Sequence, residues 1–226
     1  MTALSLTLLL WCVITLTCVG LGSGLLRITG LDSSEKTGAL DRFWLGFALL
    51  IAALQIWHFF LPVNWLATIT LAAGGGAAGL ASNAFSAARR PRVSLWCIIF
   101  LISFSLWLAL RGMDVAGNFD SGLYHFSAIR WFNEYPIVRG LANLHERLGF
   151  NQSFFLFVAW ANHFPWFNEG YHVANSLLCA VLSASLVNSA VKIARRRSKA
   201  MSDVFNTLLL PVLVWRSLGV DISSPT

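Results

Sequence analysis

The side chains best suited to chemistry gather in one polar stretch, residues 111–171. This stretch contains or adjoins four of the five histidines and holds five of the ten acidic residues. Asp120 stands in it as part of Phe-Asp-Ser-Gly, just before a run with helical spacing. A carboxylate here could act as a general base toward a hydroxyl group. It could equally cap the helix by accepting hydrogen bonds from the first turn. The two roles are compatible, because a cap fixes the side chain and leaves one oxygen free.

The run after Asp120 predicts a helix over residues 123–134, ending before Pro136. Its aromatic and small residues recur at i, i+4, i+7 and i+11 and so share one face. These residues are Tyr124, Ala128, Trp131 and Tyr135. The spacing therefore places an aromatic face on the helix that follows Asp120.

Two arginines in the second half of the stretch could hold a phosphate. Arg139 and Arg147 each carry a guanidinium group, which can donate two parallel hydrogen bonds to two oxygens of a phosphate. Arg147 could instead pair with Glu146 or with lipid headgroups, and Arg139 could lie in solvent. His145 could donate a hydrogen bond to a substrate or act as a base, or it could be purely structural.

The histidines and cysteines give little support to a metal centre. Glu169 and His172 have the Glu-x-x-His spacing of helical di-metal sites, but such sites need a second copy of the motif, which the sequence lacks. All four cysteines fall inside apolar runs, where thiols act as small hydrophobic groups. We expect no metal site and no cofactor; a divalent metal stays possible without being supported.

The composition indicates a membrane protein. Of the 226 residues, 57% are hydrophobic and 12% are charged, whereas soluble domains carry roughly 25% charged residues. The net charge of +6 is not arranged as a basic stripe on a polar surface, which argues against nucleic-acid binding. Basic clusters in such a chain are better read as markers of membrane topology.

Around the polar stretch we predict an all-α, polytopic membrane protein with about six apolar segments. Residues 1–110 would form four transmembrane helices, 111–171 an extracytoplasmic loop with membrane-parallel helices, and 172–226 the C-terminal transmembrane helices. The apolar segments are residues 3–25, 43–61, 65–87, 93–110, 173–193 and 204–215. In the third of them, the small-xxx-small pair of Gly75 and Gly79 predicts close helix packing.

Topology follows from two basic clusters, residues 89–92 and 192–199. If both are cytoplasmic, the loop 111–171 lies on the outer side. Residues 153–167 would then be an interfacial or re-entrant helix under that loop. At about 1.5 Å per residue they reach roughly 22 Å, which is short of the ~30 Å hydrocarbon core.

Residues 119–155 resemble the first large outer loop of the C-type glycosyltransferase superfamily (GT-C), closest to a bacterial branch of multi-span proteins. The resemblance lies in an Asp-x-x-x-Tyr-His motif and a Gly-Leu-x-Asn-Leu-His motif. It implies transfer of a sugar from a polyprenyl-phosphate donor to an acceptor hydroxyl. It also implies that Asp120 is the acidic residue of the loop that activates or positions the acceptor. It also suggests a set of substrate-binding residues, of which Arg139 and His145 would contact the donor phosphate or the sugar. The set is Tyr124, His125, Arg139, Asn143, His145, Arg147 and Asn151.

The sequence departs from the superfamily in two ways. Three apolar segments precede the one that leads into the loop, where many members have one, and the chain has about six where members usually have eight or more. We therefore expect an N-terminal fragment whose remaining helices belong to the rest of the chain or to a second chain. The expected partners are the lipid-linked donor and membrane lipids, in a bacterial inner membrane.

The rival interpretation is a non-catalytic membrane protein, such as a transporter fragment or an assembly subunit. Transporters usually place ionisable residues inside their spans, and here the spans are nearly free of them. That favours chemistry at the membrane surface, although structural subunits also have membrane spans without ionisable residues. A metalloenzyme or oxidoreductase ranks third, because it rests on the histidine count alone.

Overall fold

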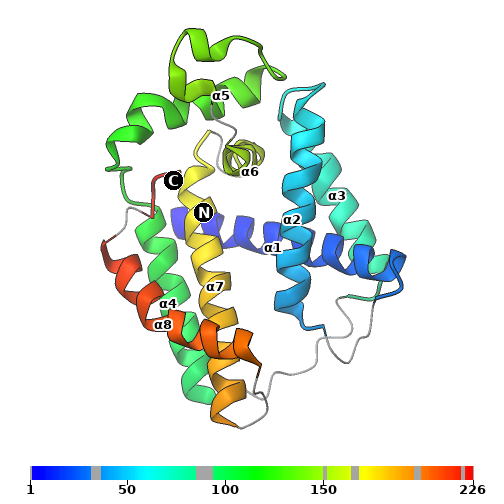
Figure 1. Ribbon diagram of the computed structural model, residues 1–226, viewed down its shortest axis with the longest axis vertical. Coiled ribbons are helices and arrows are strands. Elements are labelled where there is room, and N and C mark those ends of the chain that lie inside the picture. The colour runs from blue at the N-terminus through cyan, green and yellow to red at the C-terminus, as the bar shows by residue number, and fades with distance from the viewer. Residues whose placement is uncertain are drawn as a thin grey trace.

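The computed structural model describes residues 2–31, 37–84, 94–149, 152–163, 168–195, 200–219 and 222–225. Within these ranges every regular element is a helix, which confirms the all-α prediction (Figure 1). Each of the six expected apolar segments corresponds to a helix. These are α1 (Ala3–Ile28), α2 (Ala39–His58), α3 (Trp65–Ala81), α4 (Leu95–Gly112), α7 (Tyr171–Ala194) and α8 (Met201–Gly219).

Four helices in the described ranges are long and apolar enough to cross a membrane: α1, α2, α4 and α7. Helices α3 and α8 are also apolar, but their apolar parts are shorter. This set of helices is compatible with an integral membrane protein.

The four long helices do not form one parallel bundle. Figure 1 shows α2, α4 and α7 running along the long axis of the molecule, with α1 lying crosswise to them. A single membrane normal therefore cannot run along all four. Charged clusters and hydropathy did not reveal this arrangement, because both describe single segments and not the angles between them.

Helix α1 is held between α2 and α3 by glycine contacts. A Cβ on Gly46 of α2 would lie 1.7 Å from the carbonyl oxygen of Cys18 in α1, and a Cβ on Gly75 of α3 would lie 2.7 Å from that of Thr17. Gly75 and Gly79 are both buried. The prediction of close packing through this glycine pair is confirmed, and it rests on backbones that approach too closely for any side chain.

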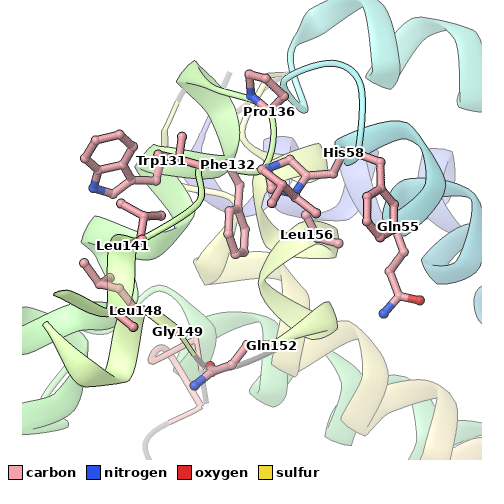
Figure 2. Close-up of a pocket in the computed structure, with 15 residues that line it drawn as sticks. Gln55, His58, Trp131, Phe132, Pro136, Leu141, Leu148, Gly149, Gln152 and Leu156 are labelled. Atoms are coloured by element: carbon pink, nitrogen blue, oxygen red, sulfur yellow. The ribbon is translucent and has the colours of Figure 1, made fainter. Parts of the chain in front are cut away.

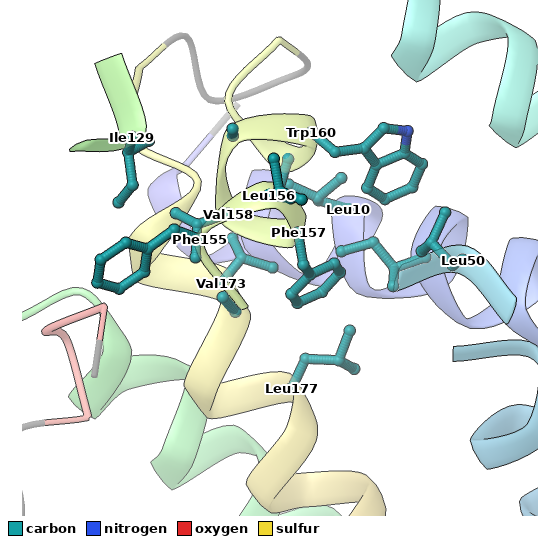
Figure 3. Packing of buried hydrophobic residues seen from close by; sticks show 14 of the residues in the cluster. Leu10, Leu50, Ile129, Phe155, Leu156, Phe157, Val158, Trp160, Val173 and Leu177 are labelled. Carbon is teal, nitrogen blue, oxygen red and sulfur yellow. The ribbon is translucent and has the colours of Figure 1, made fainter. Parts of the chain in front are cut away.

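Helix α6 (Ser153–Ala161) lies at the centre of the core. Residues 155–161 are all buried, as expected for a helix that is apolar on every side. Figure 3 shows Phe157 pointing toward Leu50 of α2 and Leu177 of α7, while Phe155 lies on the side of Ile129. At nine residues, or roughly 13 Å, α6 is too short to cross a membrane. The expected extension to residue 167 falls partly outside the described residues.

We expect Gly75→Ala to lower the thermal stability of the purified protein, because the added Cβ would overlap the backbone and side chain of Thr17. Overpacking of this kind costs about 1–3 kcal/mol. Gly74→Ala and Gly76→Ala are matched controls, since a Cβ at either position has no neighbour within 4 Å. Both should be neutral or slightly stabilising in a detergent melting assay. Equal melting temperatures for all three variants would contradict the packing described here.

Candidate functional site

The predicted helix after Asp120 exists, but it begins earlier and is capped differently. A five-residue π-helical turn, η1 (Ser121–His125), leads directly into α5 (Phe126–Glu134). Asp120 already has helical backbone angles, φ −63° and ψ −26°, and its side chain makes no capping bond. The cap is Asn118, whose Oδ1 accepts a hydrogen bond from the Asp120 N–H at 3.0 Å. The capping role predicted for Asp120 is therefore wrong, because an amide two residues earlier performs it.

The C-terminal end of α5 follows the prediction. The helix ends at Glu134, and Tyr135 is extended, with φ −135° and ψ 151°. A residue before proline avoids the helical region, and Pro136 follows here.

The carboxylate of Asp120 forms an ion pair with Arg147. Arg147 Nη1 donates to Asp120 Oδ1 at 2.5 Å, and both side chains are little more than one-third exposed. Arg147 belongs to the 3₁₀ turn η3 (Glu146–Gly149), so the bond joins residues 27 positions apart. Its guanidinium carbon also lies 5.3 Å from the centre of the Tyr124 ring, within reach of a cation–π contact. Arg147 is thus partnered by Asp120, and not by Glu146 as one interpretation had it.

Two histidines complete this cluster around Tyr124. The ring of His125 meets Tyr124 edge-on at 4.3 Å between centres, and the ring of His145 lies nearly parallel to Tyr124 at 6.4 Å between centres. His145 Nδ1 accepts a hydrogen bond from the Arg147 N–H at 3.3 Å, which leaves the proton of the neutral ring on Nε2. Five of the predicted site residues therefore lie in one group.

His125 is buried, and this shapes its titration. Burial lowers the pKa of His125 below its ordinary value because the imidazolium loses hydration; nearby Asp120 opposes the shift and Arg147 adds to it. Its Nδ1 lies 3.4 Å from Ser121 Oγ. A histidine of this kind is neutral near pH 7 and can exchange hydrogen bonds with a hydroxyl group.

Two cavities lie beside this cluster. One, of about 490 Å³, is lined by Asp120, Tyr124, His125 and residues 152–155. The other, of about 440 Å³, lies between the end of α2, α5, α6 and the loop that follows α5. Figure 2 shows its mainly apolar lining, with Trp131 and Leu141 on one side, Phe132 and Leu156 at the centre, and His58 and Gln55 on the other. Gln152 lines both cavities, so the polar and the apolar spaces adjoin there.

Three predicted site residues are not part of the group. Arg139 and Asn143 are exposed in the loop over the apolar cavity, Asn143 in the 3₁₀ turn η2 (Leu141–Asn143). In the described part of the chain, no hydrogen bond or ion pair joins either side chain to Asp120. Asn151 lies outside the described residues.

The structure adds residues that the sequence analysis did not select. Ser121 Oγ donates to Ser224 Oγ at 2.8 Å, and Asn175 Nδ2 donates to the Ser224 carbonyl at 2.5 Å. Residues 222–225 are buried, so this segment packs beside η1. Ser224 is 103 positions from Ser121, and no local pattern signals such a contact. Gln152 could have been selected from the sequence, because it is adjacent to Asn151, which was predicted to bind substrate.

Among the described residues, no group of three or more His, Cys, Asp and Glu side chains gathers as metal ligands. In the Glu-x-x-His motif, His172 Nδ1 lies 2.7 Å from the Gly112 carbonyl, to which it can donate. This histidine connects the start of α7 to the end of α4.

The sequence was also compared with known proteins. A family model described as a domain of unknown function, DUF8201, matches residues 4–226. The chain belongs to this family. Searches of curated proteins and of solved structures returned no match. The match covers both the apolar helices and the Asp120–Arg147 cluster, so the family domain includes the candidate site.

We expect the folded protein to lose stability as the pH falls below 6.5, the ordinary pKa of histidine. Above that value His125 is neutral in both the folded and the unfolded state. Below it the unfolded chain binds a proton that the buried ring resists, so unfolding becomes more favourable. In thermal melts from pH 8 to pH 5, His125→Gln should flatten part of this dependence. Parallel curves for the two proteins would refute the assignment.

Proposed function

We propose that this protein is a membrane glycosyltransferase-like enzyme that moves a sugar from a polyprenyl-phosphate-linked donor to an acceptor hydroxyl. The observation that carries the proposal is the junction at Gln152, where a polar cavity holding Asp120 adjoins an apolar cavity. A lipid-linked sugar has the same division, with a phosphate and a sugar at one end and a hydrocarbon chain at the other. The GT-C-like motifs of residues 119–155 add support from the sequence.

Arg147 is the best-placed group for the donor phosphate. It contacts both Asp120 and Tyr124, which line the polar cavity. Its side chain is partly exposed, and a guanidinium presents paired donors that suit phosphate oxygens. The hydrocarbon chain of the donor would then lie along the apolar cavity, against Trp131 and Leu156.

Asp120 would serve as general base in the transfer. Its carboxylate takes the proton of the acceptor hydroxyl as that oxygen attacks the anomeric carbon of the sugar. The bond from the anomeric carbon to the phosphate oxygen breaks, and its electron pair leaves with the polyprenyl phosphate. Arg147 neutralises the charge that gathers on the phosphate.

The same ion pair couples donor binding to catalysis in this proposal. While Arg147 is bound to Asp120, its guanidinium occupies a carboxylate oxygen that could otherwise accept the proton of the acceptor hydroxyl. A donor phosphate competes for the guanidinium and frees the carboxylate for the acceptor. The base is thus released only when the donor is present.

For the membrane arrangement we propose the topology expected from the sequence, with the loop 111–171 on the outer face of a bacterial inner membrane. In support, the C-terminal ends of α2 and α4 and the N-terminal end of α7 point toward the end of the molecule that carries α5 (Figure 1). In this arrangement α5 lies along the membrane surface with α6 beneath it, and α2, α4 and α7, which share the long axis of the molecule, cross the membrane.

A non-catalytic role is the second candidate, and one observation favours it. The Asp120–Arg147 bond ties the start of α5 to η3, and such a contact could serve stability alone. In that case the protein would be an assembly subunit or part of a transporter, and its two cavities would hold lipid without chemistry.

The two candidates differ in what happens to the Asp120→Asn variant. With membranes containing the protein and a radiolabelled polyprenyl-phosphate sugar, the enzyme should transfer label to membrane glycans or release it slowly to water. Loss of a general base lowers such rates roughly 100-fold or more, so Asp120→Asn should abolish transfer while melting near the wild-type temperature. Full activity in this variant would refute the proposed role of Asp120.

Binding of the lipid can be measured separately. Native mass spectrometry with polyprenyl phosphate should show Arg147→Gln binding it roughly tenfold more weakly, since a charge-assisted hydrogen bond is lost. Arg139→Gln is the matched control, because Arg139 is exposed and makes no contact with Asp120. Equal binding by both variants would remove Arg147 from the donor site.

A further inference from the structure

A second polar cavity, of about 760 Å³, lies along a different stripe of α5. Its wall on α5 consists of residues at helical spacing: Phe126, Ile129, Arg130, Asn133 and Glu134. The rest comes from the turn after α6 and the segment leading into α7, namely Asn162, His163, Asn168, Glu169 and Tyr171. None of these residues lines either of the cavities at Gln152.

Two hydrogen-bonded asparagines lie at the floor of this cavity. Asn133 Nδ2 donates to the carbonyl oxygens of Val63, at 2.6 Å, and Ala159, at 2.9 Å. Asn162 Nδ2 donates to Asn133 Oδ1 at 2.8 Å, and Asn162 Oδ1 accepts from the Gly170 N–H at 2.8 Å. These bonds connect α5, α6, the α2–α3 turn and the start of α7 at the floor of the cavity.

One wall of the cavity is aromatic. The rings of Phe126 and Tyr171 meet edge to face, with centres 4.9 Å apart. Tyr171 is partly exposed and lines the cavity. The Tyr171 ring also lies 4.2 Å from the ring of His172, so only its exposed part offers an apolar surface that C–H groups can cover. Its hydroxyl provides a polar edge.

Hydrogen-bonding groups remain available at the rim. Glu169 and Asn168 are exposed, and in the described part of the chain neither side chain has a hydrogen-bond partner. Arg130 and Glu134 pair with each other at 2.7 Å. The charged groups of the lining are thus one cation and two carboxylates, which disfavours an anion. This differs from the Asp120 cavity, where an arginine stands beside the site.

We infer that this cavity binds a neutral, hydroxyl-rich ligand, a saccharide. Carboxylate and amide groups at the rim can accept and donate hydrogen bonds to hydroxyls, and the Tyr171 ring can cover a sugar face. The two polar cavities lie at opposite ends of α6, one at Ser153 and the other at Asn162, a helical distance of roughly 13 Å. The inference therefore goes beyond the proposed transfer at Asp120 and holds whether or not that transfer occurs.

Saturation-transfer NMR tests this on the purified protein in detergent, with a panel of neutral mono- and oligosaccharides as probes. We expect at least one saccharide to bind, and Glu169→Ala and Asn168→Ala to weaken that binding roughly tenfold each by removing hydrogen-bonding groups. Tyr171→Phe keeps the ring packing and should lose affinity only through its hydroxyl. Inorganic phosphate, as an anionic probe, should not compete.

Two controls separate this site from the other. Glu146→Ala removes an exposed carboxylate outside the cavity, and Asp120→Asn alters the other site; both should bind the saccharide as the wild type does. Absence of binding across the panel would overturn the inference. So would a saccharide whose binding survives Glu169→Ala and Asn168→Ala but is lost in Asp120→Asn, since that would place it in the Asp120 cavity.

Discussion

The burial of α6 is the constraint on which the rest of this structure depends. This helix has no polar side, so it is stable only when other elements surround it, and α2, α5 and α7 do so. Polar groups then secure the arrangement from outside: Asn133 ties α5 to Val63 in the α2–α3 turn, and Thr68 Oγ1 donates to the Trp160 carbonyl at 2.8 Å. A buried apolar helix thereby becomes the support on which both polar cavities are built.

The chemistry of the site follows from how the chain returns to the start of α5. The loop after α5 brings Arg147 back to Asp120, and the same loop covers the apolar cavity. An ion pair between partly exposed groups contributes little to stability, of the order of 1 kcal/mol or less. In the transfer proposed above, its importance is that the guanidinium occupies the carboxylate until the donor phosphate binds the guanidinium instead. The position of this ion pair at the cavity therefore matters more than its contribution to stability.

Asp120 shows where local reasoning about this chain succeeded and where it failed. Its position at the start of a helix was correctly predicted, and so was the end of that helix before Pro136. The capping role was assigned to the wrong residue, because Asn118 lies two positions earlier and its amide reaches the same turn. Asn and Asp cap helices about equally well, so sequence alone does not decide between them. What the carboxylate does instead depends on an arginine 27 positions away.

The sequence by itself determined the helices, their apolar character, the glycine contact at Gly75, and the stretch in which the candidate site lies. These properties depend on neighbours within a few turns, where side-chain spacing and proline act directly. Only the tertiary structure decided the crosswise course of α1, the pairing of Asp120 with Arg147, and the position of Ser224 beside Ser121. Each of these depends on packing between segments distant in sequence, and several arrangements of the same helices would satisfy the same hydrophobic pattern.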